Sequence, residues 1–273
     1  MVGLCKLARM TPQNYYVCRS QRRRQEVDVG LVLELVKAER KQQPRLGVRK
    51  LYYLIAPELK AAGVKLGRDR LFVELGKVGL LVEKKPSEWP KTTSFDPNLP
   101  VFRNLLKGRK VTGRNQVWVA DITYIRTAEG FMYLALITDY WSRKIVGYHL
   151  GDSLATENAL KALAMAVKGL ASGERPIHHS DRGCQYASHA YVAGVKKAGL
   201  SMSMTETNHS AENAVAERVN GILKQEYWLD ANFAGRQEAR RATDHGICMY
   251  NTRRPHTALK FATPDQVYNA GSN

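Results

Sequence analysis

The chain has 273 residues, with 42 Lys and Arg against 25 Asp and Glu, which gives a formal net charge of +17. This length allows two or three domains, and no apolar run approaches the ~20 residues that a membrane helix needs. The N-terminus lacks the continuous apolar core of a secretory signal. The four cysteines are scattered without a CxxC pair, which argues against a disulfide framework and a zinc module and indicates a cytoplasmic protein.

The positive charge is unevenly distributed along the chain. Residues 1–114 hold 25 basic and 10 acidic side chains, a net charge of +15, whereas residues 115–273 hold 17 and 15, a net charge of +2. A basic segment joined to a nearly neutral one predicts that the first part binds a polyanion, with nucleic acid favoured over a mere contribution to solubility.

The first part of the chain predicts helices. Two short helices are expected within residues 1–20, the second with Thr11 as N-cap and Pro12 at its first position, and a separate charged helix is expected over residues 22–42. We therefore predict an N-terminal helical region over residues 1–43.

Residues 44–85 predict a helix-turn-helix-like DNA-binding segment. A first helix ends at Gly63, and a shorter second helix begins near Arg68 and Arg70. Two short helices, a turn with glycine and basic residues on the second helix favour contacts from both arginines to DNA, although a plain helical hairpin is the alternative. The proline-rich residues 86–114 predict a basic, extended linker.

The remaining chain predicts an α/β fold. Three β-rich runs are followed by alternating helices and strands, an order in which helices can cover both faces of a sheet. The strands are expected at 117–125, 131–140, 144–150, 176–181 and 201–205, and the helices at 156–171, 187–200, 213–228 and 236–251.

The stretch "HHSDRGCQY" at residues 178–186 raises the question of a zinc site. Zinc needs about four converging Cys or His ligands, and His178, His179 and Cys184 have no second pair nearby in the sequence. The adjacent histidines also point to opposite faces of a strand. We therefore expect both histidines to pack beside the strand and take Asp181 as the functional residue.

Three acids lie on otherwise apolar elements, where charge is costly: Asp121, Asp181 and Glu217. If the fold brings them together, they repel one another unless a cation neutralises them. Oxygen ligands select Mg²⁺ or Mn²⁺ over zinc, and a pair of such ions can activate the attacking oxygen and stabilise the leaving oxygen of a phosphodiester.

Four pieces of the chain identify a family resemblance: "WVADITYI", "HHSDRGCQY", "ENAVAERVNGILKQE" and "YNTRRPHTALKFATPDQVY". In this order they resemble the DDE transposases of bacterial insertion sequences that are encoded in two overlapping reading frames, and here the second-frame protein. The catalytic part is similar to the retroviral integrase core. Asp121, Asp181 and Glu217 fall on the Asp-Asp-35-Glu pattern of that family, with 35 residues between the second and third acids.

The resemblance implies a ribonuclease H-like integrase core, a mixed five-stranded sheet with flanking helices, over residues 115–232, followed by a C-terminal helix and tail over residues 233–273. It implies a transposase that cleaves DNA at the element ends and transfers the strands, with a pair of Mg²⁺ or Mn²⁺ ions held by the three acids. The implied partners are the terminal repeats, the target DNA, the first-frame protein as a frameshifted fusion, and further copies of the chain on DNA. The implied location is the bacterial cytoplasm, at the nucleoid.

Three points remain open at this stage. Glu212 is a rival for the third acid, but Glu217 shares a helix face with Asn213, Asn220 and Lys224, a polar stripe suited to binding a DNA end. The alternative functions are a nuclease that only hydrolyses DNA and a catalytically inactive DNA-binding regulator. For Lys224, the alternative to a phosphate contact is a solvated lysine that pairs with Glu226 or a neighbouring turn.

Overall fold

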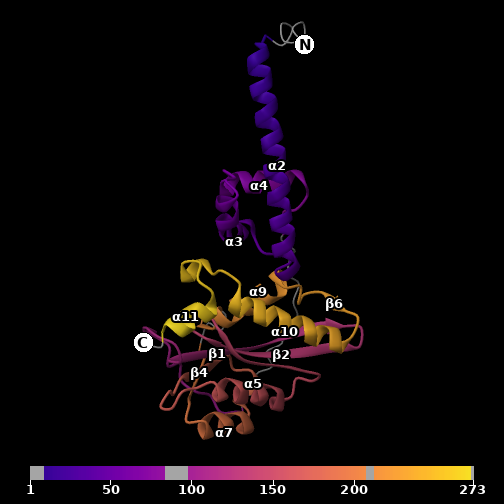
Figure 1. Cartoon of the computed structure of the whole chain (residues 1–273). Coiled ribbons are helices and arrows are strands. Elements are labelled where there is room, and N and C mark those ends of the chain that lie inside the picture. Colours follow the sequence, from indigo (N-terminus) through magenta and orange to yellow (C-terminus); the bar gives the residue numbers. More distant parts are fainter. Residues whose placement is uncertain (1–8, 84–97, 207–211, 272–273) are drawn as a thin grey trace. The chain divides into compact units, whose positions relative to one another are not determined.

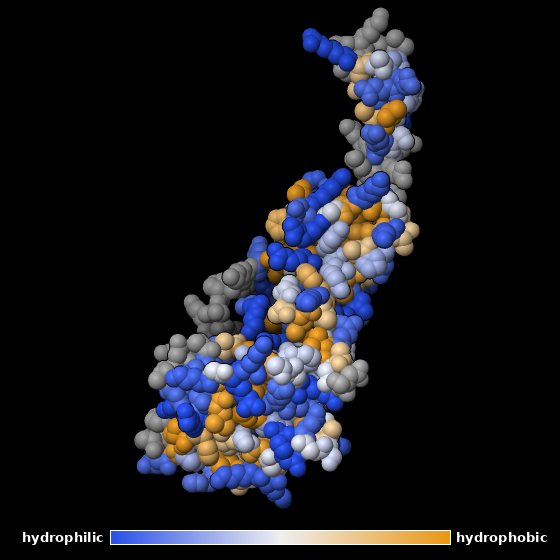
Figure 2. Space-filling model, turned by 90° about the vertical axis from the view of Figure 1, so that its left-hand side faces the viewer, coloured by the Kyte–Doolittle hydropathy of each residue, from blue (hydrophilic) through white to orange (hydrophobic). Residues whose placement is uncertain are grey.

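The computed structural model describes residues 9–83, 98–206 and 212–271, and the chain divides into two compact units, Met1–Lys84 and Lys85–Asn273 (Figure 1). Within these described ranges, no helix is long and apolar enough to cross a membrane. On the face that Figure 2 shows, hydrophobic residues are interspersed with hydrophilic ones.

The first element described in this unit is one long helix, α2, Pro12–Gln42. Thr11 caps it by accepting a hydrogen bond from the backbone N–H of Asn14, as expected. The prediction of a separate helix from residue 22 was wrong, because no helix breaker stands between Pro12 and Gly30 and the basic run continues the helix. The first of the short helices expected within residues 1–20 falls largely outside the described residues.

Two further helices follow in the described part of the first unit: α3, Val48–Ala61, and α4, Arg68–Lys77. Gly63 follows α3 with φ +70°, the left-handed conformation that makes glycine a frequent helix terminator. The three helices pack around an aliphatic core, which consists of Val32, Val36, Leu46, Leu51, Ile55, Leu59, Val64, Leu71 and Leu75. The unit therefore has its own hydrophobic core, while the DNA-binding role of α3 and α4 stays a prediction.

The second unit is built on a mixed sheet in the order β3-β2-β1-β4-β5. Strands β1 to β3 are antiparallel neighbours, whereas β4 pairs parallel with both β1 and β5. A two-residue strand, β6, runs parallel to the end of β1. The strand bounds are β1 Val117–Thr127, β2 Gly130–Asp139, β3 Ile145–Gly151, β4 Ile177–Ser180, β5 Ser201–Met204 and β6 Asn232–Phe233.

Helices cover both faces of this sheet (Figure 1). On one face, α5 (Thr156–Lys168) and α7 (His189–Lys197) pack on side chains such as Trp118 and Ile137. On the other face, α9 (Ala214–Glu226) and α10 (Arg236–Thr252) pack on side chains such as Ile125 and Leu134. The strand residues alternate between the two cores, which is why β1 and β2 read as nearly continuous apolar runs.

The described part of the expected linker, residues 98–114, packs against the rest of the second unit. Phe102 contacts the α5–α7 core. The amide Nδ2 of Asn104 donates to Oε2 of Glu212 at 3.1 Å, and the backbone N–H of Leu105 donates to Oγ of Ser203 at 2.9 Å. This segment is thus part of the second unit.

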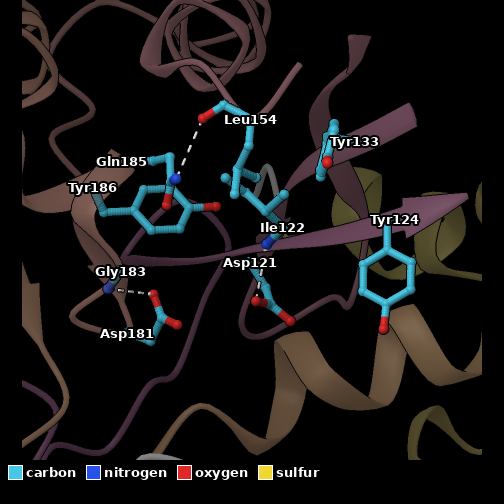
Figure 3. A pocket seen from close by; sticks show the side chains of 9 residues that line it. All are labelled: Asp121, Ile122, Tyr124, Tyr133, Leu154, Asp181, Gly183, Gln185 and Tyr186. Carbon is cyan, nitrogen blue, oxygen red and sulfur yellow. Dashed lines mark hydrogen bonds between the residues drawn. The ribbon is translucent and has the colours of Figure 1, made fainter. Parts of the chain in front are cut away.

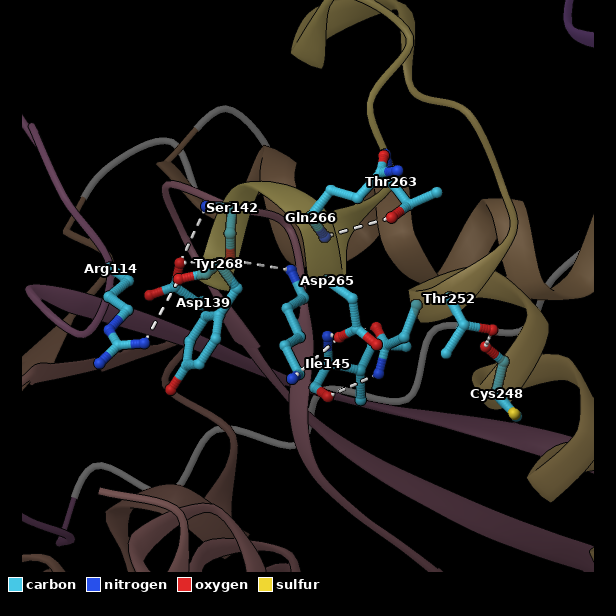
Figure 4. Close-up of polar contacts among 12 residues, drawn as sticks. Arg114, Asp139, Ser142, Ile145, Cys248, Thr252, Thr263, Asp265, Gln266 and Tyr268 are labelled. Carbon is cyan, nitrogen blue, oxygen red and sulfur yellow. Dashed lines mark hydrogen bonds and ion pairs between the residues drawn. The ribbon is translucent and has the colours of Figure 1, made fainter. Parts of the chain in front are cut away.

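The C-terminal segment ends in α11, Pro264–Ala270, which begins with a capping box between Thr263 and Gln266. The ring of Tyr268 lies next to Arg114 (Figure 4), whose guanidinium is 5.0 Å from the ring centre. The ammonium of Lys144 lies 4.5 Å from the same ring centre. These cation–π contacts fix the C-terminal segment to residues that flank β1 and β3.

Candidate active site

The sheet register brings Asp121 and Asp181 side by side. In the parallel pair β1–β4, Trp118 lies opposite His178 and Val119 opposite His179. The same offset makes Asp121 level with Asp181, which directly follows the last residue of β4. Both carboxylates line one pocket (Figure 3).

Both aspartate side chains are held in fixed orientations. Oδ1 of Asp121 accepts the backbone N–H of Ile122 at 2.9 Å, and its Oδ2 accepts Nδ2 of Asn220 at 2.7 Å. Oδ1 of Asp181 accepts the backbone N–H of Gly183 at 3.0 Å, a turn closed by the aspartate itself. The site is therefore ordered by local backbone contacts and one amide from α9.

The three acids influence each other electrostatically. Burial, followed by the charge of Asp181, raises the pKa of Asp121 to about 7; the charge of Glu217 adds to this, while the hydrogen bond from Asn220 opposes it. Glu217 thus lies near enough for its charge to act on Asp121, although its own side chain is exposed in the first turn of α9. This repulsion is what a bound cation would relieve.

The donor chemistry fits a hard divalent cation, because all three side chains offer only oxygen. In the described part of the chain, however, no three His, Cys, Asp or Glu side chains lie close enough together to form a ready-made metal site. The rival acid, Glu212, accepts hydrogen bonds from Nδ2 of Asn104 and from the backbone N–H of Glu206. Its carboxylate thus joins two segments that are distant in sequence.

The polar stripe of α9 packs on β1. Nδ2 of Asn213 donates to the backbone carbonyl of Ala120 at 3.1 Å, and Asn220 donates to Asp121 as described above. Nζ of Lys224 lies 4.6 Å from the centre of the Tyr124 ring. All three stripe residues are buried, so their contacts orient α9 on the strand that carries Asp121, and their role in DNA binding stays a prediction.

Lys224 is not a solvated lysine, because its side chain is only 7% exposed. Burial lowers its pKa to about 8, and the charge of Asp121 limits this effect. The alternative of a solvated lysine is therefore wrong, and Glu226, its partner in that alternative, binds both Nε and Nη2 of Arg254 at 2.8 Å.

The two histidines have separate buried neighbours. Nε2 of His178 is 2.8 Å from the hydroxyl of Tyr191, and Nδ1 of His179 is 2.9 Å from Oγ of Ser203. Burial lowers the pKa of His178 to about 3, so that it is neutral at physiological pH. The expectation that both pack beside the strand is confirmed.

Arg68 and Arg70 lie in the other unit, at the start of α4. Nε of Arg68 is 2.8 Å from Oδ1 of Asp69, and Nε of Arg70 is 3.9 Å from Oε1 of Glu74. Both arginine side chains are about half exposed, at 50% and 48%. They are accessible to a ligand, and their contact with DNA stays a prediction.

Sequence reasoning missed part of the pocket wall, which includes Tyr133, Leu154 and Gln185. These residues come from β2, from the segment before α5 and from the short helix α6, Cys184–Ala187. Only Gln185 had a signal in the sequence, because it falls within "HHSDRGCQY". The others reach the pocket through sheet register and helix packing, which residue spacing does not predict.

Comparisons with known proteins point to one family. The integrase core domain family matches residues 111–210 and, in a second form, residues 198–264. An uncharacterised 31 kDa protein of insertion element IS600 from Shigella sonnei is 36% identical over 96% of each chain. The transposase of insertion sequence IS629 from Shigella sonnei is 32% identical over 98% of this chain and 90% of its own.

The chain belongs to the integrase-core transposases of insertion sequences. Transposase InsF of insertion sequence IS3A from Escherichia coli, 30% identical over 98% of this chain and 93% of its own, is a further relative. The transposase is therefore a member of the polynucleotidyl transferases.

The fold of the transposase agrees with this assignment. A chain of the simian T-cell lymphotropic virus intasome, solved in complex with PP2A regulatory subunit B56 gamma, is 18% identical, covers 81% of this chain and 74% of its own, and has a TM-score of 0.50. This likeness concerns the fold alone. The expected ribonuclease H-like core with a mixed sheet and flanking helices is confirmed, and integrase-type cores generally use divalent metal ions.

Proposed function

We propose that this transposase cleaves DNA at the ends of its insertion sequence and joins the freed strands to target DNA, with Asp121, Asp181 and Glu217 as the catalytic residues. The observation that carries the proposal is the pocket shared by Asp121 and Asp181, which come from neighbouring strands, together with the effect of Glu217 on the pKa of Asp121. Three acids that repel each other in one place are costly unless they serve a cation.

The proposed reaction has two displacements at phosphorus. In the first, a water oxygen forms a bond to the phosphorus at the element end, and the bond from phosphorus to the 3′ oxygen breaks, which leaves a 3′-hydroxyl. In the second, this hydroxyl attacks a target phosphodiester, whose own 3′ oxygen leaves. The number of phosphodiester bonds is conserved in the second step, so joining needs no external energy source and no covalent intermediate on the protein.

The protein would contribute fixed charge and orientation. Asp121, Asp181 and Glu217 would hold a pair of Mg²⁺ or Mn²⁺ ions, which supply activation of the attacking oxygen and stabilisation of the leaving one. Since Glu217 is exposed on α9, its side chain would turn toward the aspartates on binding. Asn220 keeps Asp121 oriented, and Lys224 is proposed to bind a phosphate of the DNA end once the site is filled.

The wider proposal includes the partners. The basic first unit, through α4 with Arg68 and Arg70, would bind the terminal repeats, and several copies would assemble on DNA at the nucleoid in the cytoplasm. The resemblance further suggests a frameshifted fusion with the first-frame protein as the active form. An inactive DNA-binding regulator is the alternative; it would have no physical need for three mutually repelling acids.

The proposal is tested with a labelled duplex that carries the element end. We expect cleavage in Mg²⁺ or Mn²⁺, its loss in EDTA without unfolding, and its recovery when Mg²⁺ is returned. Asp121→Asn and Asp181→Asn should each reduce cleavage by orders of magnitude while DNA binding persists. A regulator would bind the duplex equally well with or without these carboxylates and would never cut it.

A further inference from the structure

The pocket that holds Asp121 and Asp181 extends beyond the two carboxylates. In Figure 3 the acids lie at one side of it, and the opposite side is formed by apolar and aromatic side chains. That side comprises Ile122, Tyr133, Leu154 and Tyr186, with Gln185 beside them, whereas Tyr124 lies on the same side as Asp121. The metal chemistry proposed above uses none of the residues on the opposite side.

The aromatic wall is fixed by the sheet and by the helix beside it. Tyr133 lies on β2 directly opposite Tyr124 of β1, and the Tyr124 ring itself is covered by Nζ of Lys224 at 4.6 Å. The ring of Tyr186 is held edge-on against Tyr191, with ring centres 5.2 Å apart. A flat, apolar ligand would meet preformed surfaces here.

Tyr186 carries the most informative polar atom of the pocket. Its side chain is only 2% exposed, yet its hydroxyl is buried without a hydrogen-bond partner in the described structure. Figure 3 shows this hydroxyl directed away from the helix and into the pocket. A buried hydroxyl without a partner costs about 1–3 kcal/mol, so such groups call for a ligand or water that satisfies them.

Gln185 supplies a second polar group. Its Nε2 donates to the backbone carbonyl of Leu154 at 3.3 Å, which ties α6 to the segment before α5. This contact fixes the amide at the pocket and leaves its oxygen available as an acceptor. A hydroxyl that can donate and an amide that can both donate and accept, next to aromatic faces, form the set of groups that recognises the edge and the face of a nucleobase.

We propose that this pocket holds the base of one nucleotide next to the phosphodiester on which the aspartates act. The base packs against Tyr133 and Leu154, and its edge accepts a hydrogen bond from the hydroxyl of Tyr186. The side-chain amide of Gln185 forms a second hydrogen bond to the edge of the base. This inference rests on the proposed function, because that function places a DNA strand at Asp121 and Asp181. It adds a subsite that positions the strand and favours particular bases beside the cleavage point.

Binding of the element end by the full chain tests the pocket without any catalysis. The affinity is measured in EDTA for duplexes in which each of three nucleotides on either side of the cleavage point is made abasic in turn. Wild-type protein should show one position where loss of the base weakens binding about tenfold. In Tyr186→Phe, which deletes only the hydroxyl, the loss of affinity at that abasic position should be about three- to tenfold smaller than in wild type. In Tyr133→Ala most of that loss should disappear.

Thermal unfolding of the same variants separates a ligand contact from a structural one. Tyr186→Phe should unfold at a temperature no lower than wild type, because the deleted hydroxyl has no partner in the folded protein. The matched control is Tyr191→Phe: its hydroxyl bonds to His178, so that this variant should lose stability but keep the abasic penalty. A drop in stability for Tyr186→Phe, or an abasic penalty equal to that of wild type at every position, overturns the proposal.

The subsite and the proposed function fail in different ways. Glu217→Gln, outside the pocket wall, should lose cleavage in Mg²⁺ but retain the abasic penalty in EDTA. If Glu217→Gln and the aspartate variants still cleave, the proposed function is wrong whatever the binding data. If cleavage follows the carboxylates but no single base matters for binding, only the nucleobase pocket is wrong.

Discussion

Asn220 has the most direct influence on one of the proposed catalytic carboxylates, that of Asp121. Its 2.7 Å hydrogen bond to Oδ2 of Asp121 and the 2.9 Å bond from the N–H of Ile122 to Oδ1 together fix both oxygens. Asn220→Ala removes one of the two contacts. Because a hydrogen bond to a charged group contributes about 1.5–3 kcal/mol, we expect cleavage to fall about 10- to 100-fold.

The measurement that checks Asn220 combines two readouts. DNA binding in EDTA should be unchanged within about twofold. The Mn²⁺ concentration that gives half-maximal metal binding, measured by electron paramagnetic resonance, should rise by about tenfold. This is the loss of metal affinity expected when a residue that orients a metal ligand is removed. A variant that binds Mn²⁺ normally but loses DNA affinity would show instead that Asn220 contacts DNA.

The pKa of Asp121 predicts a pH dependence of stability. It is raised from 3.8 to about 7, mainly by burial and by Asp181. The folded protein therefore holds this proton more tightly than the unfolded chain, and the resulting stability is complete below about pH 4 and lost as the pH rises through 7. The full effect is at most about 4 kcal/mol.

Thermal unfolding in EDTA between pH 4 and pH 8 checks this linkage. Wild-type protein should lose stability across the range, and Asp121→Asn should lose markedly less, since an amide does not titrate. Addition of Mg²⁺ at pH 8 should stabilise wild type more than the variant. Parallel stability curves for the two proteins would show that Asp121 titrates normally.

Among the elements, α9 depends on an ion pair at its C-terminal end. Arg254, 2% exposed, binds both carboxylate oxygens of Glu226. This pair joins the last turn of α9 to the segment after α10. Removal of one partner leaves a buried charge, so we expect Arg254→Ala to lower the free energy of unfolding by about 3–5 kcal/mol.

Chemical denaturation of three variants measures the contribution of the Arg254–Glu226 ion pair to stability. Glu226→Gln should cost less than Arg254→Ala because the guanidinium keeps a polar neighbour. An exposed arginine on the same chain, in Arg236→Ala, is the control, with an expected change below about 1 kcal/mol. A loss for Arg254→Ala no larger than for Arg236→Ala would exclude a structural role of the pair.

The positions of the longer helices and strands could be predicted from the sequence. The strands and helices of the second unit were placed within a few residues, because apolar runs of strand length alternate with helical stripes. The short elements α6, β6 and α11 were missed, since two to seven residues leave no periodicity. The continuity of α2 was missed because a basic run resembles a boundary, although it contains no breaker.

For the candidate site, the sequence could propose only the acids. Asp121 and Asp181 were recognisable because each interrupts or ends an apolar strand, and Glu217 because of its spacing. The contacts of Asn220 and the position of Lys224 depend on how α9 rotates on β1, and the pocket wall depends on register. These are tertiary features, which residue spacing in the sequence does not predict.

At the scale of the whole molecule, the charge is divided between the units. Residues 1–84 hold 18 basic and 8 acidic side chains, a net charge of +10, around their own core. Since residues 98–114 pack on the second unit, the fragment 1–84 is the natural one to isolate. We expect it to bind DNA with a slope of log K against log salt of about −0.9 for each phosphate contacted.

Fluorescence anisotropy from 50 to 300 mM salt measures that slope for the fragment. Arg68→Ala and Arg70→Ala should each reduce its magnitude by about one and weaken binding, if α4 contacts the DNA backbone. The neighbouring lysine variant Lys77→Ala, at the far end of α4, is the control. A folded fragment without salt-sensitive binding would place DNA recognition elsewhere in the transposase.

The central claim is that one carboxylate cluster performs cleavage and joining, with Glu217 as its helix-borne member. The most direct measurement is a strand-transfer assay in Mg²⁺ with precleaved element-end DNA and a supercoiled target, comparing Glu217→Gln with Glu212→Gln. Each change removes a single charge and conserves shape. The account predicts that Glu217→Gln abolishes joined product while Glu212→Gln retains most of it; an active Glu217→Gln together with an inactive Glu212→Gln would contradict the assignment.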